Sequence, residues 1–326
     1  MKCTNRISKP LSLTSILLCA FLLCGCGNEG ISLKSSYQTY EVDSKRADVI
    51  TTNTYLAKDL CVTEGVNFGM DKTDSQVATS AGVFNATTKE TLYCQNIFEK
   101  VHPASTTKVL TAYIILRDCK LDEKVTVSET INSLDKDSSV CYLEPGDVIT
   151  VKDLLYGLLL NSGNDAAVAL AEHHSHSVDA FAEEMNRTAI SLGATNSHFV
   201  NSHGLDDENH YTTVYDMYLI FNQAISLDSF VEIIKTLNYT ATYTGANGKE
   251  ITTTWSNTNR YLSQKAEAPN GITVVGGKTG TTFQSGYCLV LLSYNEKNEK
   301  IISLVYKADG SWNLYLLMNQ ILSFAN

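Results

Sequence analysis

The chain has 326 residues, of which 44% are hydrophobic and 18% are charged. This length suits one large domain or two ordinary ones, and the hydrophobic content excludes a largely disordered chain and a polytopic membrane protein. With 35 acidic and 25 basic residues the formal net charge is −10, which argues against nucleic acid as a main partner.

The N-terminus has the pattern of an export signal. Three basic residues among the first nine precede an apolar run over 11–24, which is too short for a comfortable membrane span and has the length of a signal-peptide core. The run ends in Leu23-Cys24-Gly25-Cys26, which resembles a bacterial lipobox. The resemblance implies that Cys26 is lipidated and becomes the first mature residue. Ordinary signal-peptidase cleavage and an uncleaved anchor remain alternatives.

Cleavage before Cys26 would leave a tethered domain. Residues 1–25 carry three bases and no acids, so the net charge would change from −10 to −13. A polar stretch follows, and a flexible chain of its length spans about 25–30 Å root-mean-square. We therefore predict a lipoprotein signal peptide over 1–25, lipidated Cys26 and a tether over 26–54, and one domain over 55–326. This domain would be extracytoplasmic and anchored to the cell membrane.

The first elements after residue 55 are a hairpin and a group of helices. Strands over 81–85 and 91–94 are separated by a polar turn, which predicts the hairpin. Apolar residues at helical spacing predict a helix beginning near Ser105. Three further helices are expected over 153–160, 165–173 and 178–192.

The C-terminal part changes to a strand pattern. Strands are expected over 238–243, 251–255, 272–275, 286–294 and 301–306, followed by a last helix over 312–322. Strands at both ends with helices between them predict one α/β (α+β) domain. Because hairpins join the late strands, its sheet should be antiparallel.

Three short motifs carry chemistry: Ser105-Thr-Thr-Lys108, Ser162-Gly-Asn164 and Lys278-Thr279-Gly280. Each alone is weak, since a second Ser-x-x-Lys occurs at Ser133 and Lys136, and a lone Ser105 could simply cap a helix. Their order, however, is that of a serine acyl-transfer signature. The ordered trio therefore favours a nucleophilic serine.

The spacing of the first motif suits nucleophilic catalysis. Residues i and i+3 share a helix face, so Lys108 should lie beside the Ser105 hydroxyl. To act as a base, the lysine needs its pKa lowered by about 3 units, which corresponds to about 4 kcal/mol. Burial beside a second cation, Lys278, acts in that direction.

The other motif residues have matching tasks. The backbone N–H of Ser105, at a helix N-terminus, could hold an oxyanion. Ser162 could relay a proton, and Asn164 could hold a substrate amide. Lys278-Thr279-Gly280 could open an edge strand along which an extended peptide lies.

These motifs and their flanks, Pro103–Lys108, Leu158–Ala167 and Gly276–Thr282, resemble the serine-type D-alanyl-D-alanine carboxypeptidases, the low-molecular-mass penicillin-binding proteins. The resemblance covers roughly residues 55–326. It implies a penicillin-binding/β-lactamase-like fold, with an antiparallel sheet flanked by helices and a mostly helical subdomain. It also implies removal of the terminal D-Ala from peptidoglycan stem pentapeptides through an acyl-enzyme on Ser105, and covalent inhibition by β-lactams.

Site roles follow from the same resemblance. Ser105, Lys108 and Ser162 would be catalytic, with Lys108 as the acylation base. The substrate-binding residues would be Asn164, Lys278, Thr279, Gly280 and Thr281, and the backbone N–H of Thr281 would complete the oxyanion hole. No cofactor is implied. Arg260 is a candidate for the substrate carboxylate, but a solvated or ion-paired arginine is the expectation.

Several alternatives stay open. A D,D-endopeptidase is not separated from a carboxypeptidase by the sequence. A non-catalytic penicillin sensor is the alternative of another class, and the intact trio argues against it, because a binding module has no need for Lys108 beside Ser105. A class A β-lactamase needs a glutamate-positioned water, and the nearest pattern, Ala182–Asn186, lacks the first glutamate and fits a surface helix.

Histidines and cysteines complete the candidate residues. His173, His174 and His176 have no acidic or cysteine partner at ligand spacing, so a solvated helix end without metal is expected. His203 and His210 are expected to be structural hydrogen-bonding residues. Nine cysteines suggest a disulfide scaffold, but four lie in the first 26 residues. The remaining five are Cys61, Cys94, Cys119, Cys141 and Cys288. At least one of these is therefore unpaired, and Cys288 on an apolar strand should be a buried small hydrophobe.

Overall fold

The computed structural model describes residues 57–326. The predicted signal peptide, Cys26 and the tether lie outside the described residues, so they stay predictions. Within the described part, none of the helices alone has the length and apolar composition needed to cross a bilayer. Helices α6 (Val214–Ala224) and α7 (Asp228–Ile234) meet both criteria only as a pair, and they are bent by 110°.

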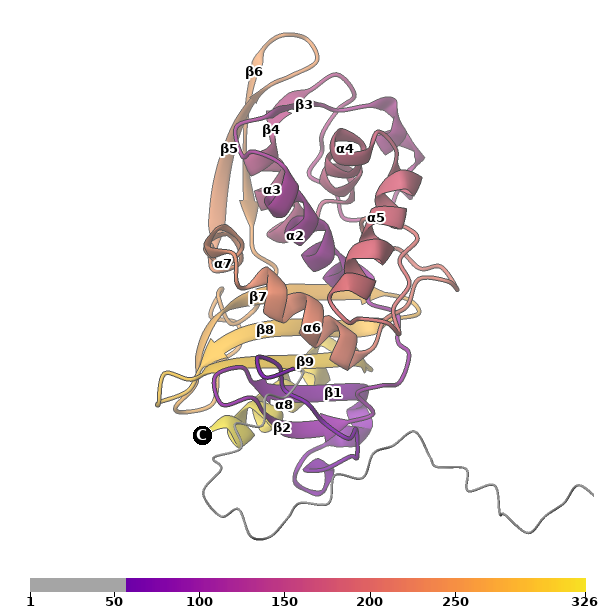
Figure 1. Ribbon diagram of the computed structural model, residues 1–326. Coiled ribbons are helices and arrows are strands. Elements are labelled where there is room, and N and C mark those ends of the chain that lie inside the picture. The colour runs from indigo at the N-terminus through magenta and orange to yellow at the C-terminus, as the bar shows by residue number, and fades with distance from the viewer. Residues whose placement is uncertain (1–56) are drawn as a thin grey trace, which may run out of the picture. The chain divides into compact units, whose positions relative to one another are not determined.

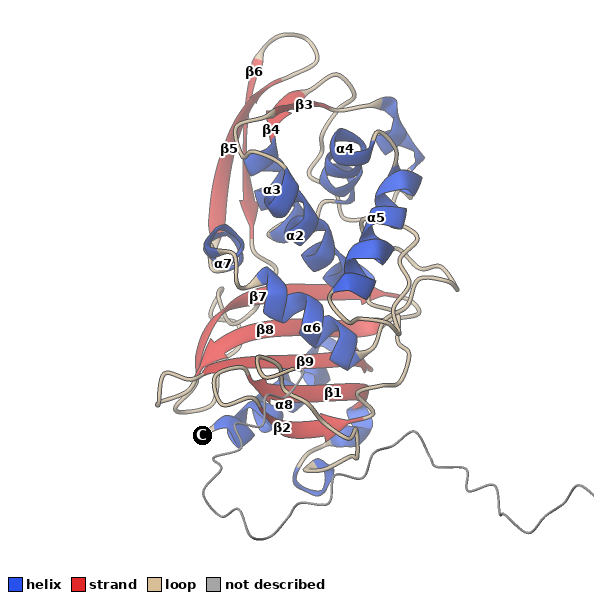
Figure 2. Ribbon diagram, viewed as in Figure 1, coloured by secondary structure: helices blue, strands red, loops and turns tan. Residues whose placement is uncertain are grey.

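A five-stranded antiparallel sheet forms the base of the described part (Figures 1 and 2). Its strand order is β2-β1-β9-β8-β7, so the N-terminal hairpin pairs with the C-terminal strands. The strands are β1 (Ala78–Asn85), β2 (Glu90–Gln95), β7 (Thr273–Thr282), β8 (Gly286–Tyr294) and β9 (Lys300–Ala308). Strand β7 lies at one edge of this sheet.

Helices cover both faces of the sheet. Successive strand residues point to opposite faces, and neighbouring residues accordingly belong to two different apolar clusters. Val83 and Leu289 pack with α8 (Ser311–Leu322), whereas Phe84 and Val290 belong to the cluster that contains α6. In Figure 1, α6 lies in front of the sheet and α8 behind it. The late strands are buried on both faces, and their sequences are therefore runs of apolar residues.

A second region contains most of the helices and a small antiparallel sheet. Its helices are α2 (Lys108–Asp118), α3 (Val151–Leu159), α4 (Asn164–Ser175), α5 (Val178–Ser191) and α7. Its strands, in the order β3-β4-β5-β6, are β3 (Lys124–Thr126), β4 (Val148–Thr150), β5 (Asn238–Thr244) and β6 (Glu250–Ser256). Short 3₁₀ helices occur at Met70–Lys72, Ser75–Val77, Ala104–Thr107, Glu129–Ser133 and Ser323–Ala325.

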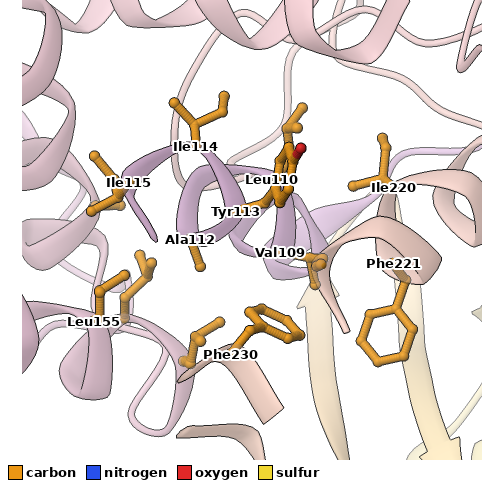
Figure 3. Close-up of a cluster of buried hydrophobic side chains, with 14 of the residues drawn as sticks. Val109, Leu110, Ala112, Tyr113, Ile114, Ile115, Leu155, Ile220, Phe221 and Phe230 are labelled. Atoms are coloured by element: carbon orange, nitrogen blue, oxygen red, sulfur yellow. The ribbon is translucent and has the colours of Figure 1, made fainter. Parts of the chain in front are cut away.

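The centre of the helical region is α2. All its residues from Lys108 to Ile115 are buried, so this helix has no solvent face over two turns. Figure 3 shows its apolar side chains gathered with Leu155 of α3, Phe221 of α6 and Phe230 of α7. A helix packed on every side holds its N-terminal residues firmly, and Lys108 is the first of them.

The expected α/β fold with antiparallel strands is confirmed, with three differences. The expected single sheet is wrong, because β5 and β6 pair with β4 in a separate sheet. Helices α6 and α7 and the three-residue strands β3 and β4 were not predicted. The strand expected over 272–275 continues to Thr282, so Lys278-Thr279-Gly280 lies inside β7 rather than opening it.

Candidate active site

Ser105 lies in the 3₁₀ turn that leads into α2. Its predecessor Ala104 has φ +48°, a left-handed conformation that is uncommon for a residue with a Cβ. Gly204 packs directly against this turn, since a Cβ at Gly204 would lie 1.9 Å from the Ala104 carbonyl oxygen. The turn thereby places Ser105 Oγ 3.0 Å from Lys108 Nζ, the juxtaposition that the i,i+3 spacing predicts.

The Lys108 amine is fully buried and surrounded by acceptors. It donates to Asn164 Oδ1 at 2.7 Å and to the His203 carbonyl oxygen at 2.6 Å. Burial, and then the nearby cation Lys278, hold the pKa of Lys108 well below its usual range. In the neutral amine the two N–H groups can stay on these acceptors, which leaves the lone pair for the Ser105 hydroxyl proton. Lys108 is therefore placed to act as a base.

Ser162 and Lys278 form a second pair beside the first. Lys278 Nζ donates to Ser162 Oγ at 3.0 Å and to the Thr279 carbonyl oxygen at 2.9 Å. Burial lowers the pKa of Lys278 to about 7. Ser162 has φ +63° in the turn between α3 and α4, which directs its side chain to the cleft that Ser105 also lines.

Asn164 begins α4 and has a free donor. Its Oδ1 is taken by Lys108, and its Nδ2 has no hydrogen-bond partner within residues 57–326. Because Asn164 also lines the cleft, the Nδ2 can donate to a bound carbonyl.

The edge strand β7 forms one wall of the site. A Cβ on Gly280 would lie 3.0 Å from Ser105 N and 3.0 Å from Ala104 Cβ, so the strand passes directly over the serine turn. Thr279 Oγ1 is hydrogen-bonded to Thr258 Oγ1 at 2.6 Å, and Thr281 is exposed at the cleft. An edge strand offers unpaired backbone groups to an extended peptide.

Two hollows share Ser105. The first, of about 260 Å³, is also lined by Ser162, Thr279 and Arg260. The second, of about 410 Å³, is also lined by Asn164 and by the fully exposed Phe283. A ligand can therefore extend to both sides of the serine hydroxyl.

Of the two expectations for Arg260, the ion-paired arginine is wrong. It is partly buried, lies 5.5 Å from the Tyr315 ring centroid and forms no ion pair with any residue of 57–326. Its partner Tyr315 comes from α8, a contact too distant along the chain to be inferred from local sequence. A guanidinium in this position can receive a carboxylate.

The expectations for the histidines are confirmed at some positions and wrong at others. The ring nitrogens of His203 and His210 bond to the Leu205 N–H and to Thr107 Oγ1, and burial lowers both pKa values to about 3, so these residues are structural as expected. His176 is exposed at the end of α4, as expected, but the solvated helix end is wrong for the other two: His173 lies 2.8 Å from Glu123 and His174 3.0 Å from Asp118. Sequence spacing missed these partners because a separate segment supplies them.

Other candidates lie outside the site. Asn186, from the β-lactamase-like pattern, donates to the Phe199 carbonyl oxygen at 2.7 Å and so joins α5 to a loop. Within the described residues no disulfide occurs: the free cysteines are Cys61, Cys94, Cys119, Cys141 and Cys288. Cys288 is fully buried, as predicted. Sequence reasoning missed the His203 carbonyl oxygen as a Lys108 partner, since a backbone acceptor leaves no signal in residue type.

Comparisons with known proteins agree with this geometry. The chain is 33% identical to the D-alanyl-D-alanine carboxypeptidase DacF of Bacillus subtilis, over 76% of this chain and 62% of that protein. It is 34% identical to a D-alanyl-D-alanine carboxypeptidase of Streptomyces sp. strain K15, over 75% of this chain and 85% of that protein. Among solved structures, the Streptomyces K15 DD-transpeptidase matches with a TM-score of 0.70 and 31% identity, covering 76% of this chain and 97% of that one. The model of the peptidase S11 family, described as D-alanyl-D-alanine carboxypeptidase, matches residues 68–310, and the chain belongs to this family.

Proposed function

We propose that this chain is a serine D,D-carboxypeptidase that removes the terminal D-Ala from peptidoglycan stem pentapeptides. The observation that carries the proposal is the Ser105 hydroxyl 3.0 Å from a buried lysine whose pKa is well below its usual range. Membership of the peptidase S11 family supports the substrate class.

The geometry supports an acyl-enzyme route. Ser105 Oγ passes its proton to Lys108 and attacks the carbonyl carbon of the penultimate D-Ala. The oxyanion is held by the backbone N–H groups of Ser105 and Thr281. As the C–N bond breaks, the proton held by Lys108 passes through Ser162 to the leaving amine, and Lys108 becomes neutral again. Water then attacks the ester and gives a proton to Lys108. Lys108 returns a proton to Ser105 Oγ as the ester C–O bond breaks, and the shortened peptide leaves.

The two hollows suggest how the peptide lies. The terminal carboxylate fits the hollow with Arg260 and Thr279, because a guanidinium and a hydroxyl there face the cleft. The acyl part fits the other hollow, where Asn164 Nδ2 donates to an amide carbonyl. Strand β7 pairs with the extended backbone between them.

The test compares Ser105→Ala with the matched control Ser133→Ala. We expect the wild type and Ser133→Ala to release D-Ala from a defined pentapeptide and to be labelled by a fluorescent penicillin, whereas Ser105→Ala does neither. A wild type that is labelled but releases no D-Ala is a penicillin sensor. Products from cross-linked muropeptides alone indicate an endopeptidase, and fast penicillin turnover contradicts the assignment.

We further propose that the chain is an exported lipoprotein anchored to the membrane through Cys26. The apolar run and the lipobox-like Leu23–Cys26 support this placement, which fits a wall-peptide substrate. Cys26→Ser should abolish incorporation of labelled fatty acid and shift the protein to the aqueous phase, while Cys24→Ser should not. Equal labelling of the two variants would contradict the anchor.

A further inference from the structure

A cluster of metal-ligating side chains lies at the far end of α2 from the candidate active site. Cys119 follows the last residue of α2, Glu123 follows a short turn, and His173 lies in the last turn of α4. One ligand atom from each residue lies within 4.8 Å of the other two.

The turn holds two of these residues in place. The Cys119 N–H donates to the Ile115 carbonyl oxygen at 2.9 Å and so ends the helix. The Lys120 N–H donates to Glu123 Oε1 at 2.9 Å, which leaves Oε2 facing His173 Nε2 at 2.8 Å. The Glu123 carbonyl oxygen accepts from the Val151 N–H at 3.0 Å, which fixes the turn to the start of α3.

The ligand types narrow the choice of metal. A thiolate, an imidazole and a carboxylate together suit Zn²⁺, whereas Ca²⁺ and Mg²⁺ prefer oxygen ligands alone. In a tetrahedral zinc site ligand atoms lie about 3.3–3.8 Å apart. The Glu123 and His173 ligand atoms, 2.8 Å apart, therefore have to separate by about 0.5 Å, and the Cys119 sulfur has to approach them by about 1.5 Å at most. Partial exposure, 23% for the His173 side chain and 38% for that of Glu123, permits this movement and gives an ion access.

We propose that Cys119, Glu123 and His173 bind one Zn²⁺, with water as the fourth ligand. Binding releases the Cys119 thiol proton to solvent and replaces the Glu123–His173 hydrogen bond with two bonds to the metal. No oxidation or reduction is involved.

The site is structural. Along α2, Cys119 lies about 16 Å from Lys108, too far for the metal to touch the serine. Joining the ends of α2 and α4 stabilises the folded state, which alone has the three ligands together. The adjacent His174–Asp118 pair is not a member of this three-residue group and therefore serves as a built-in comparison.

The test uses the full-length chain after removal of metal with a chelator. Titration with Zn²⁺ against a chromophoric chelator should give one equivalent bound and a higher melting temperature. Co²⁺ should give the charge-transfer absorption of thiolate ligation. Cys119→Ser and His173→Gln should each weaken binding by at least about 100-fold, while His174→Gln should bind as the wild type does.

Two results would overturn the site. One is a wild type without stoichiometric binding or thiolate absorption, which needs no variant to interpret. The other is a folded Cys119→Ser/His173→Gln double variant that still binds one Zn²⁺ tightly, which would assign the metal to other cysteines of the chain. Circular dichroism of the metal-free variants establishes that they fold.

Discussion

Two Ser-x-x-Lys motifs occur only 28 residues apart in this chain, Ser105–Lys108 and Ser133–Lys136, and their surroundings differ completely. Lys108 is fully buried at the start of α2 and contacts Ser105 Oγ. Ser133 and Lys136 are exposed, and Ser133 Oγ donates to the Thr130 carbonyl oxygen. The four-residue motif therefore identifies only a candidate lysine. Burial at the start of a rigidly packed helix is what allows that lysine to act as a base.

The largest effect should come from removing the two lysines separately. Lys108→Ala should slow acylation by a chromogenic β-lactam by about 10³-fold, since it removes the base. Lys136→Ala should stay within about twofold, because an exposed side chain outside the network contributes little. Stopped-flow acylation rates measure both. Equal losses in the two variants would remove the distinction between the motifs.

Substitutions at two glycines test how the 3₁₀ turn that contains Ser105 is held in position. Gly204 and Gly248 both have positive φ, +93° and +75°, so alanine is strained at either position. A Cβ at Gly204 would also meet the Ala104 carbonyl oxygen at 1.9 Å, whereas nothing lies within 4 Å at Gly248. Gly204→Ala should therefore lower the free energy of unfolding by about 1–3 kcal/mol more than Gly248→Ala. It should also slow penicillin labelling.

Urea denaturation and labelling rates check this pair. If both alanine variants lose the same stability, the loop at Gly204 can move away from the serine turn. The turn would then owe its position to its contacts with β7 and β9.

Local patterns predicted the elements that have a clear period or clear ends. The hairpin of β1 and β2, the helices α3, α4 and α5 and the final helix all fall within a few residues of their predicted bounds. Helix α6 was missed because residues on all its sides are buried, so no polar face marks its period. Strands β3 and β4, of three residues each, are too short to show alternation.

The order of the motifs predicted the residues of the candidate site that lie in those motifs. It did not predict contacts that form between segments distant along the chain. Ser105, Lys108, Ser162 and Lys278 are joined by hydrogen bonds in two neighbouring pairs, and their motifs named them in advance. The Tyr315 support of Arg260 depends on how α8 packs. The contact of His173 with Glu123 spans 50 residues, a distance at which no spacing rule applies.

The pH dependence of acylation should report the charge beside Lys108. The neutral amine is the base, so the rate rises as pH passes upward through the pKa of Lys108. Lys278 lowers this pKa, while Asp165 and Cys141 raise it. Lys278→Met removes the neighbouring cation and should move the ascending limb to higher pH. Each unit of movement costs tenfold in rate at a fixed lower pH.

Lys278→Arg is the matched control, because the guanidinium keeps its charge at every working pH. The ascending limb of its pH–rate profile should lie at the same pH as in the wild type or at a lower pH. If the ascending limb moves to higher pH equally in both variants, the shape of residue 278, and not its charge, governs the pKa of Lys108.

The smallest effect concerns how the serine turn is tied to the sheet. Thr106 Oγ1 donates to the Pro103 carbonyl oxygen at 2.7 Å and accepts from the Tyr306 hydroxyl of β9, also at 2.7 Å, with both side chains fully buried. Tyr306→Phe removes one buried hydrogen bond and should cost about 1 kcal/mol in urea denaturation. Tyr294→Phe on β8 should cost less than about 0.5 kcal/mol, because its hydroxyl has no partner among residues 57–326. In the described part of the chain, the Ser133 motif has no comparable hydrogen bond to this sheet. If Tyr306→Phe costs no more stability than Tyr294→Phe, packing alone holds the Ser105 turn.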